Sequence, residues 1–259
     1  MGSGTWSIDG DVDFTDGSIT AGTSTLDLSG NSDQSLTSAN QALYNLTISN
    51  PSSSSTYIVG DTTVDTFTAI TPSSRIVFTA GATYNFTNIN INGQATDTRI
   101  TLVSSSPGTQ WLLNVSGSQT VAYVDVSDSD ASGGNQINAT DNCLNSGNNT
   151  NWLFATDHII VSPASITMYP SDTTQFTAVA YDSSNYPIPG AVFNWSVVAG
   201  GGTITDTGLF TAGSTPGTFT NTIQAENSGV TGTATVIIQS PPSSPEEPSP
   251  DTDNNAGNT

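Results

Sequence analysis

The sequence contains no lysine and only two arginines, Arg75 and Arg99, so its 22 acidic residues give a formal net charge of −20. Asp and Glu are themselves not abundant, and the imbalance therefore comes from missing cations rather than from added carboxylates. Two cations cannot neutralise a phosphate backbone or hold an anionic lipid surface. The charge thus argues against nucleic acid as a partner and against binding to anionic membranes.

Long apolar runs are missing as well. No stretch of about 18 apolar residues occurs, so we predict no membrane-spanning helix and expect no membrane insertion. The first four residues, MGSG, carry no secretory signal. We expect that a signal peptide has been removed from a protein that is extracellular or lies on a cell surface.

The sequence has a single cysteine, Cys143, which excludes a disulfide bond within the chain. We interpret this cysteine as a small buried apolar residue, because unpaired cysteines commonly behave as small hydrophobic side chains. A disulfide bond between two chains is the alternative.

Small polar residues dominate what is present. The chain holds 36 Ser, 41 Thr, 23 Asn and 24 Gly among its 259 residues, whereas Glu occurs three times. β-Branched and turn-forming residues favour strands and turns over helices. The apolar residues, 34% of the chain, lie in short alternating runs, which is the pattern of folded strands. We therefore predict an all-β protein.

The sequence divides into three zones, residues 1–155, 156–240 and 241–259. In the first zone, short apolar runs bounded by Gly, Ser, Asn or Asp recur roughly every 20 residues, which predicts a stacked parallel β-helix, or solenoid. An antiparallel sandwich is the competing interpretation. The third zone is rich in Pro, Ser and Asp and has no large hydrophobic residue, so we predict a disordered linker or tail.

Parts of the first zone also resemble a known type of fold. The carrying segments are residues 45–48 (NLTI), 93–111, 124–134 (VDVSDSDASGG) and 145–154 (NSGNNTNWLF). They are similar to the right-handed parallel β-helix segments of large bacterial surface and secreted proteins, and the last of them resembles the closing strand of such segments. The resemblance implies a fold and a location, and it says little about activity.

The second zone resembles a bacterial immunoglobulin-like domain over residues 158–239. The carrying segments are 160–163 (IVSP), 175–178 (QFTA), 193–196 (FNWS), 208–213 (GLFTAG) and 232–236 (GTATV). The resemblance implies a β-sandwich that holds together through its core without a disulfide. The alternation of apolar residues agrees, and we predict that Trp195 lies between the two sheets.

We find no set of residues that predicts catalysis. The only histidine, His158, lies at the boundary between the first two zones, and we interpret it as a solvated linker residue. A β-helix lyase would use cations, but Arg75 and Arg99 each precede a strand and are interpreted as solvated edge charges. A hydrolase would use paired carboxylates. The acidic residues of segment 9–13 (DGDVD) alternate with inward-pointing apolar residues and are explained by strand alternation alone.

One segment resembles the first half of a calcium-binding loop. Residues 128–133 (DSDASG) place oxygen-bearing side chains at alternate positions before a glycine. Asp128, Asp130 and Ser132 are therefore the candidate ligands of a calcium site, to which Asp125 or Asp141 would contribute a further ligand. The position of the final EF-hand ligand is not Glu, so a helix–loop–helix site is excluded. The alternative is a solvated, Asp-rich turn.

These observations favour a non-enzymatic extracellular structural module of a bacterial surface or secreted protein, acting as a stalk, spacer or filament subunit. Its expected partners are neighbouring domains or copies of itself. The alternative is an adhesin or carbohydrate-binding module that binds glycans through Tyr44, Tyr57, Tyr84 or Tyr123. A third hypothesis is a polysaccharide-degrading β-helix enzyme. Because nothing before Trp6 predicts a cap, we expect the first turn to be the open end through which a filament would grow.

Overall fold

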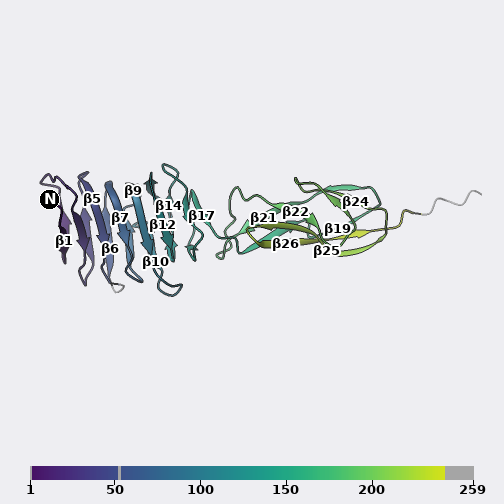
Figure 1. Cartoon of the computed structure of the whole chain (residues 1–259), viewed down its shortest axis with the longest axis horizontal. Coiled ribbons are helices and arrows are strands. Elements are labelled where there is room, and N and C mark those ends of the chain that lie inside the picture. The colour runs from purple at the N-terminus through teal and green to yellow at the C-terminus, as the bar shows by residue number, and fades with distance from the viewer. Residues whose placement is uncertain (1, 52–53, 243–259) are drawn as a thin grey trace, which may run out of the picture. The chain divides into compact units, whose positions relative to one another are not determined.

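The computed structural model describes residues 2–51 and 54–242 (Figure 1). Over these residues the chain forms strands and no helix, as the composition predicted. The predicted tail, residues 241–259, falls outside the described residues from position 243 onward. The chain divides into two compact units, one of residues 1–159 with 179–192, and one of residues 160–178 with 193 onward.

A membrane-spanning helix, long and apolar enough to cross a bilayer, is not found in the part of the chain that the structure describes.

The first unit is a parallel β-solenoid of about six turns. Figure 1 shows its strands stacked in chain order, beginning at β1. Two parallel sheets form its main faces, which we call face A and face B. Face A consists, in order, of β1 (Thr5–Ile8), β3 (Thr25–Leu28), β5 (Ala42–Ile48), β7 (Thr62–Ala69), β9 (Thr83–Asn92), β11 (Trp111–Val115) and β14 (Ser129–Asp130), with β12 (Gln119–Ala122) paired to the second half of β9.

Face B consists, in order, of β2 (Val12–Asp13), β4 (Gln34–Thr37), β6 (Ser55–Val59), β8 (Arg75–Phe78), β10 (Ile100–Ser104), β13 (Val124–Val126) and β16 (Leu144–Asn145). A further parallel pair, β15 (Ile137–Ala139) and β17 (Trp152–Phe154), ends the solenoid. The strand pairs of both faces are parallel, so the solenoid prediction is confirmed and the antiparallel alternative for this zone is wrong.

The distance of roughly 20 residues between corresponding apolar runs is the length of one turn of the solenoid. Leu26, Leu46, Phe67 and Ile89 lie in register on neighbouring strands of face A, and each is buried. Residues on either side of each point outward, as strand alternation requires. The interior therefore needs only one or two apolar side chains per strand, which explains how a Ser- and Thr-rich chain fills a core. Full burial of each such side chain contributes about 1.5–3 kcal/mol.

Aromatic residues fill the middle of the solenoid. The rings of Phe67 and Phe86 stack with centroids 4.8 Å apart, and those of Phe78 and Trp111 stack at 4.0 Å. Tyr84 is fully buried between them and needs partners for its hydroxyl. The hydroxyl donates to the Ile58 carbonyl at 2.7 Å and accepts from the backbone N–H of Thr79 at 2.8 Å. Burial raises the pKa of Tyr84 to about 12.

Carboxylates pin one turn of the solenoid to the next. Asp33 Oδ1 accepts from the backbone N–H of Ser55 at 2.8 Å, and Asp61 Oδ1 accepts from that of Thr83 at 2.7 Å. The two donors, Ser55 and Thr83, are the first residues of β6 and β9 in the following turn. Such charge-assisted bonds are stronger than neutral ones. Asp33 and Asp61 thus hold successive turns together. We call carboxylates that accept a hydrogen bond from a neighbouring turn brackets.

The second unit contains two small sheets. A separate strand pair, β18 (His158–Ser162) and β21 (Thr177–Tyr181), has residues in both units. One sheet has the order β19 (Ser165–Met168), β26 (Val230–Ile238), β25 (Gly217–Asn227) and β22 (Asn194–Val197). The other has the order β20 (Thr173–Gln175), β24 (Leu209–Ala212) and β23 (Gly202–Ile204). The β19–β26 pair is parallel and the other pairs within these two sheets are antiparallel.

The core of the second unit is centred on two phenylalanines rather than on a tryptophan. Phe176 and Phe210 are fully buried and meet edge to face, with ring centroids 6.1 Å apart. Trp195 lies on β22 and is only partly buried, with its ring 6.5 Å from that of Phe193. The predicted alternation around Trp195 is present, but this side chain is not the most deeply buried one.

Candidate functional site

The predicted calcium ligands lie at the start and end of β14, where they hold turns. Asp128 is buried, and its Oδ1 accepts from the backbone N–H of Gly108 at 3.1 Å and from Asn148 Nδ2 at 2.7 Å. Asp130 Oδ1 accepts from the backbone N–H of Ser132 at 2.9 Å. The described residues contain no group of three or more His, Cys, Asp or Glu placed to hold a metal ion. The calcium site stays a prediction.

The two further ligands proposed for that site have partners of their own. Asp125 Oδ1 accepts from the Ser146 hydroxyl at 2.5 Å, and Asp141 Oδ1 accepts from Asn142 Nδ2 at 2.8 Å. Ser146 follows the strand that pairs with β13, so its bond to Asp125 joins two turns of the solenoid. Asp125 is therefore a further bracket between two turns, whereas Asp141 bonds to its neighbour in the same turn.

The cations and the histidine are engaged locally. Arg75 Nη1 donates to the Ser55 hydroxyl at 3.2 Å, across neighbouring strands of face B. Arg99 Nε donates to the Asn142 carbonyl at 2.8 Å, and its Nη1 donates to the Thr96 carbonyl at 2.7 Å. His158 lies in β18, where its ring stacks on that of Tyr181 with centroids 5.1 Å apart. Arg75, Arg99 and His158 therefore stabilise neighbouring strands and loops.

The acidic segment 9–13 is likewise occupied with turns. Asp11 Oδ1 accepts from the backbone N–H of Ser35 at 2.7 Å, and Asp13 accepts from both the hydroxyl and the backbone N–H of Thr15. The hydrogen bonds from Thr15 lower the pKa of Asp13. Asp11 is therefore a bracket between two turns, whereas Asp13 holds the chain within its own turn.

The four tyrosines considered for glycan binding do not form one surface. Tyr44 and Tyr57 are exposed on faces A and B respectively. Tyr84 is a core residue, and Tyr123 is partly buried at a position with a positive φ of 53°. The structure therefore brings none of these rings together into an aromatic platform.

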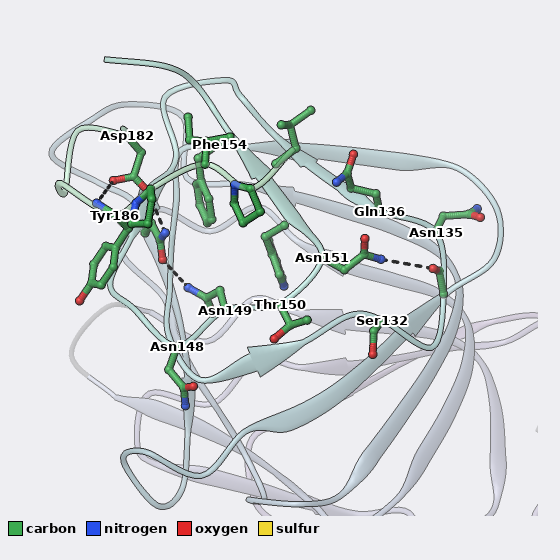
Figure 2. Close-up of a pocket in the computed structure, with 17 residues that line it drawn as sticks. Ser132, Asn135, Gln136, Asn148, Asn149, Thr150, Asn151, Phe154, Asp182 and Tyr186 are labelled. Atoms are coloured by element: carbon green, nitrogen blue, oxygen red, sulfur yellow. Dashed lines mark hydrogen bonds between the residues drawn. The ribbon is translucent and has the colours of Figure 1, made fainter. Parts of the chain in front are cut away.

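A large pocket lies instead at the closing end of the solenoid (Figure 2). We call it the amide pocket. It is lined by side chains from residues 132–136, 145–154 and 182–189, all of which belong to the first unit, and its volume is about 970 Å³. The strand β17 forms one wall, and the loop 182–189 forms the wall opposite. Among residues 2–51 and 54–242, β17 pairs with β15 alone, so it is an edge strand there.

A buried carboxylate fixes the loop wall of the pocket. Asp182 is only 3% exposed. Its Oδ1 accepts from the backbone N–H groups of Ser184 at 2.9 Å and Tyr186 at 3.0 Å, and its Oδ2 accepts from Asn145 Nδ2 at 2.8 Å. Three donors satisfy this charge, as a buried carboxylate requires. Asp182 therefore shapes the loop 182–189 and ties it to the last strand of face B.

Asparagines fix the wall on the solenoid side. Asn149 donates from Nδ2 to the Val126 carbonyl and to Asn145 Oδ1, each at 2.8 Å, and its Oδ1 accepts from the backbone N–H of Ser129 at 3.0 Å. Asn151 Nδ2 donates to the Ala131 carbonyl at 2.9 Å. These amides close backbone hydrogen bonds that the last turn would otherwise leave open. They form the rigid frame of the amide pocket.

Other polar groups of the pocket remain available. The side-chain amides of Asn135 and Gln136 are exposed and make no hydrogen bond within residues 2–51 and 54–242. The same holds for the hydroxyl of Tyr186, whose side chain is 42% exposed. This hydroxyl lies over Gly147, where a Cβ would come within 2.6 Å of it and where φ is +102°. Glycine at position 147 thus makes room for the tyrosine.

Apolar groups complete the lining. The rings of Trp152 and Phe154 stack on β17 with centroids 6.3 Å apart and an interplanar angle of 14°. Trp152 is held in place because its Nε1 donates to the Ser129 hydroxyl at 3.0 Å. Pro187 and Ile188 of the loop also line the pocket. No Lys, Arg or His lines the pocket, and its one carboxylate, Asp182, is already satisfied.

The sequence offered only part of this site. The resemblance to β-helix segments predicts a closing strand within residues 145–154, and these residues line one side of the pocket. The opposite wall comes from residues that the sequence analysis placed inside another domain. The hydrogen bond between Asn145 and Asp182 and the contact of Tyr186 with Gly147 bring the two segments together.

A second, smaller pocket of about 440 Å³ lies at the first turn, beside Trp6. Trp6 stands in register with Leu26 but is 50% exposed, because β1 is the end strand of face A. Asp11 and Asp13 also line this pocket. Self-association through this end stays a prediction.

Neither a protein-family model nor a curated protein sequence matches the chain.

Proposed function

We propose that the chain is a non-enzymatic extracellular structural module of a bacterial surface or secreted protein, in which the solenoid acts as a stalk or spacer. The observation that carries this proposal is the unbroken run of parallel pairs through face A, from β1 to β14. A spacer must keep its length under load. In this unit each turn is held to the next by backbone bonds, by the buried side-chain stack and by carboxylate brackets.

We further propose that residues 156–240 are an immunoglobulin-like domain and that residues 241–259 are a linker. A four-stranded and a three-stranded sheet with alternating burial support the first of these proposals. In this arrangement the solenoid of residues 1–155 and the following domain act as successive parts of an extended surface protein, and the partners are neighbouring domains or further copies of the chain.

Force spectroscopy on the full chain, held at its two ends, tests the spacer role. We expect the solenoid to resist load and then to extend in one large step, because its core is continuous. Leu46→Ala should lower the force of this step, since Leu46 is fully buried and its truncation costs about 2–5 kcal/mol. Thr47→Ala, one residue further along the same strand and facing outward, is the matched control. Gradual peeling of single turns at low force would contradict the proposal.

A second candidate function is glycan binding by an adhesin-like module. The specific observation that favours it is the amide pocket, with its fixed walls and its available amides and hydroxyl.

A further inference from the structure

We propose that the amide pocket binds a neutral saccharide of about two or three sugar units. The proposal deepens the second candidate function by naming a site and a ligand class, and it is independent of the spacer role. The volume of about 970 Å³ lies at the upper end of the range of roughly 300–1,000 Å³ that is typical of small-molecule sites. A single sugar ring would leave much of this space empty, whereas a short oligosaccharide would occupy it.

The available polar groups match the hydroxyls of a sugar. Each side-chain amide offers two donors and one acceptor, and a phenolic hydroxyl can donate or accept. Gln136, Asn135 and Tyr186 therefore provide both kinds of partner on the rim of one pocket. A sugar hydroxyl also donates and accepts, so it can bond to any of them without a fixed protonation state.

The apolar groups match the other surface of a sugar ring. The ring carries C–H groups on its faces, and these pack on aromatic and aliphatic side chains. Leu153, Pro187 and Ile188 are partly or fully exposed and offer such a surface within the same pocket as the amides. Trp152 and Phe154, each 6% exposed, form the packed layer behind it. A pocket that combines a few placed polar groups with an apolar lining is the usual form of a small-ligand site.

Charge excludes the other ligand classes. The pocket has no cationic side chain, and the chain carries a net charge of −20, so an anion such as a phosphate or a uronate would be disfavoured. The three hydrogen bonds to Asp182 occupy its carboxylate, so a cation finds no available charge. A purely apolar ligand would cover the amides and leave them without hydrogen-bond partners, which disfavours its binding.

The frame of the pocket is set before a ligand arrives. Asn145, Asn149 and Asn151 are bonded to the backbone or to each other, and Asp182 fixes the loop. Little side-chain freedom is then lost from the walls on binding, which favours affinity. The groups that would contact the ligand are thus distinct from the groups that hold the walls, so they can be changed without unfolding the site.

Titration of the full chain with a defined panel tests the proposal. The neutral probes are cellotriose, maltotriose, xylotriose, mannotriose and N,N′,N″-triacetylchitotriose. The anionic probes are sialyllactose and trigalacturonic acid. Binding is measured by saturation-transfer NMR and by calorimetry. We expect at least one neutral probe to bind with a Kd between about 1 μM and 1 mM, and the anionic probes to bind at least about tenfold more weakly.

Two variants place the binding in the pocket. Gln136→Ala and Tyr186→Ala should each weaken the binding of the neutral probe about tenfold or more, with unchanged melting temperatures, since both side chains are exposed. Gln239→Ala, an exposed glutamine of the second unit, and Tyr169→Ala, a tyrosine that is 45% exposed, are the matched controls and should bind as the parent does.

Three results would overturn the proposal. The first is that no neutral probe binds at concentrations up to about 10 mM, far above the weakest expected Kd. The second is that the anionic probes bind as well as the neutral ones. The third is that Gln136→Ala and Tyr186→Ala bind the neutral probe as the parent does, which would move the saccharide site elsewhere on the chain. A sedimentation assay with insoluble glucan and mannan then separates polymeric glycans from free oligosaccharides as the source of the ligand.

Discussion

Asn145 donates a hydrogen bond of 2.8 Å to the carboxylate of Asp182, although the two residues lie 37 positions apart in the chain. Asn145 is the last residue of β16, at the end of face B, and Asp182 begins the loop that faces β17. Both residues are also bonded to their own surroundings, through Gly147 and Asn149 on one side and through Ser184 and Tyr186 on the other. This one bond therefore joins two preformed local structures into the amide pocket.

Asp182→Ala should destabilise the closing end of the solenoid. The change removes the acceptor for three donors, and hydrogen bonds to charged groups contribute about 1.5–3 kcal/mol each in favourable cases. We expect a loss of about 2–4 kcal/mol in the free energy of unfolding of the first unit, and faster hydrogen exchange in residues 137–154. Asp97→Ala, which removes an exposed carboxylate, is the control and should change neither. Unchanged exchange in Asp182→Ala would show that the loop is held by other contacts.

Tyr84→Phe should cost about 1 kcal/mol in the free energy of unfolding. The change removes the buried hydroxyl, but the N–H of Thr79 keeps a second bond of 3.3 Å to the Ile58 carbonyl, so the loss is moderate. Urea denaturation measures it, with Tyr44→Phe on the exposed face as control. A loss above about 3 kcal/mol would mean that the packing of the aromatic core depends on this hydroxyl.

The same tyrosine predicts a loss of stability in alkali. The pKa of Tyr84 is raised to about 12 from the ordinary value of 10.0, mainly because burial disfavours the phenolate. The folded state therefore binds this proton more tightly than the unfolded state does. The resulting stability is fully present below pH 10 and is lost as the pH rises towards 12. The difference in stability between the parent and Tyr84→Phe should shrink over this interval, and a constant difference would contradict the assignment.

Cys143 should react slowly with alkylating reagents in the folded protein. Burial is the main cause that raises the pKa of its thiol to about 11, from 9.0. At pH 8 roughly one thiol in a thousand is then ionised, and the thiolate is the reactive form. We expect alkylation at least tenfold slower than in denaturant, measured by mass spectrometry. Equal rates would show that the thiol is accessible in the folded protein, and so able to form the disulfide bond between chains that is the alternative for Cys143.

How much of this could be read from the sequence depends on the range of the interactions. The alternation around Leu26, Leu46 and Phe67 is a local pattern, and it predicted both the strands and the stacking of turns. The brackets from Asp33 and Asp61 to the following turn were missed, since they depend on the lengths of the intervening turns. In both bonds the donor lies 22 positions from the aspartate, and a single pair at that distance leaves no periodic pattern in the sequence.

The site was harder to predict than the fold for the same reason. The DSDASG segment was singled out because its spacing is local, whereas in the structure Asp128 and Asp130 accept hydrogen bonds from different partners. The amide pocket requires residues 145–154 and the loop 182–189 to meet, and no pattern within either segment predicts that contact. Its available groups, Gln136 and Tyr186, look like ordinary surface residues in the sequence.

Calcium dependence tests the remaining prediction on Asp128, Asp130 and Ser132. If these residues hold an ion in the folded state only, calcium at about 100 times its Kd raises the free energy of unfolding by about 2.7 kcal/mol. The melting temperature should then rise with calcium and fall with a chelator, and Asp130→Ala should remove the difference. A melting temperature that is the same with calcium and with chelator would leave the hydrogen-bonded turn as the full account of this segment.

The spacer role rests on a stack of turns with fixed spacing, and one distance tests this most directly. Ser7, Asp27, Thr47, Thr68 and Asn90 lie in register on successive strands of face A. Spin labels on Ser7→Cys and Asn90→Cys, in a Cys143→Ala background, are therefore four strand spacings apart, a Cα separation of about 19 Å. We predict a single narrow distance distribution in pulsed electron resonance that corresponds to this separation. A broad distribution, or a separation of 30 Å or more, roughly six strand spacings, would contradict the stacked solenoid.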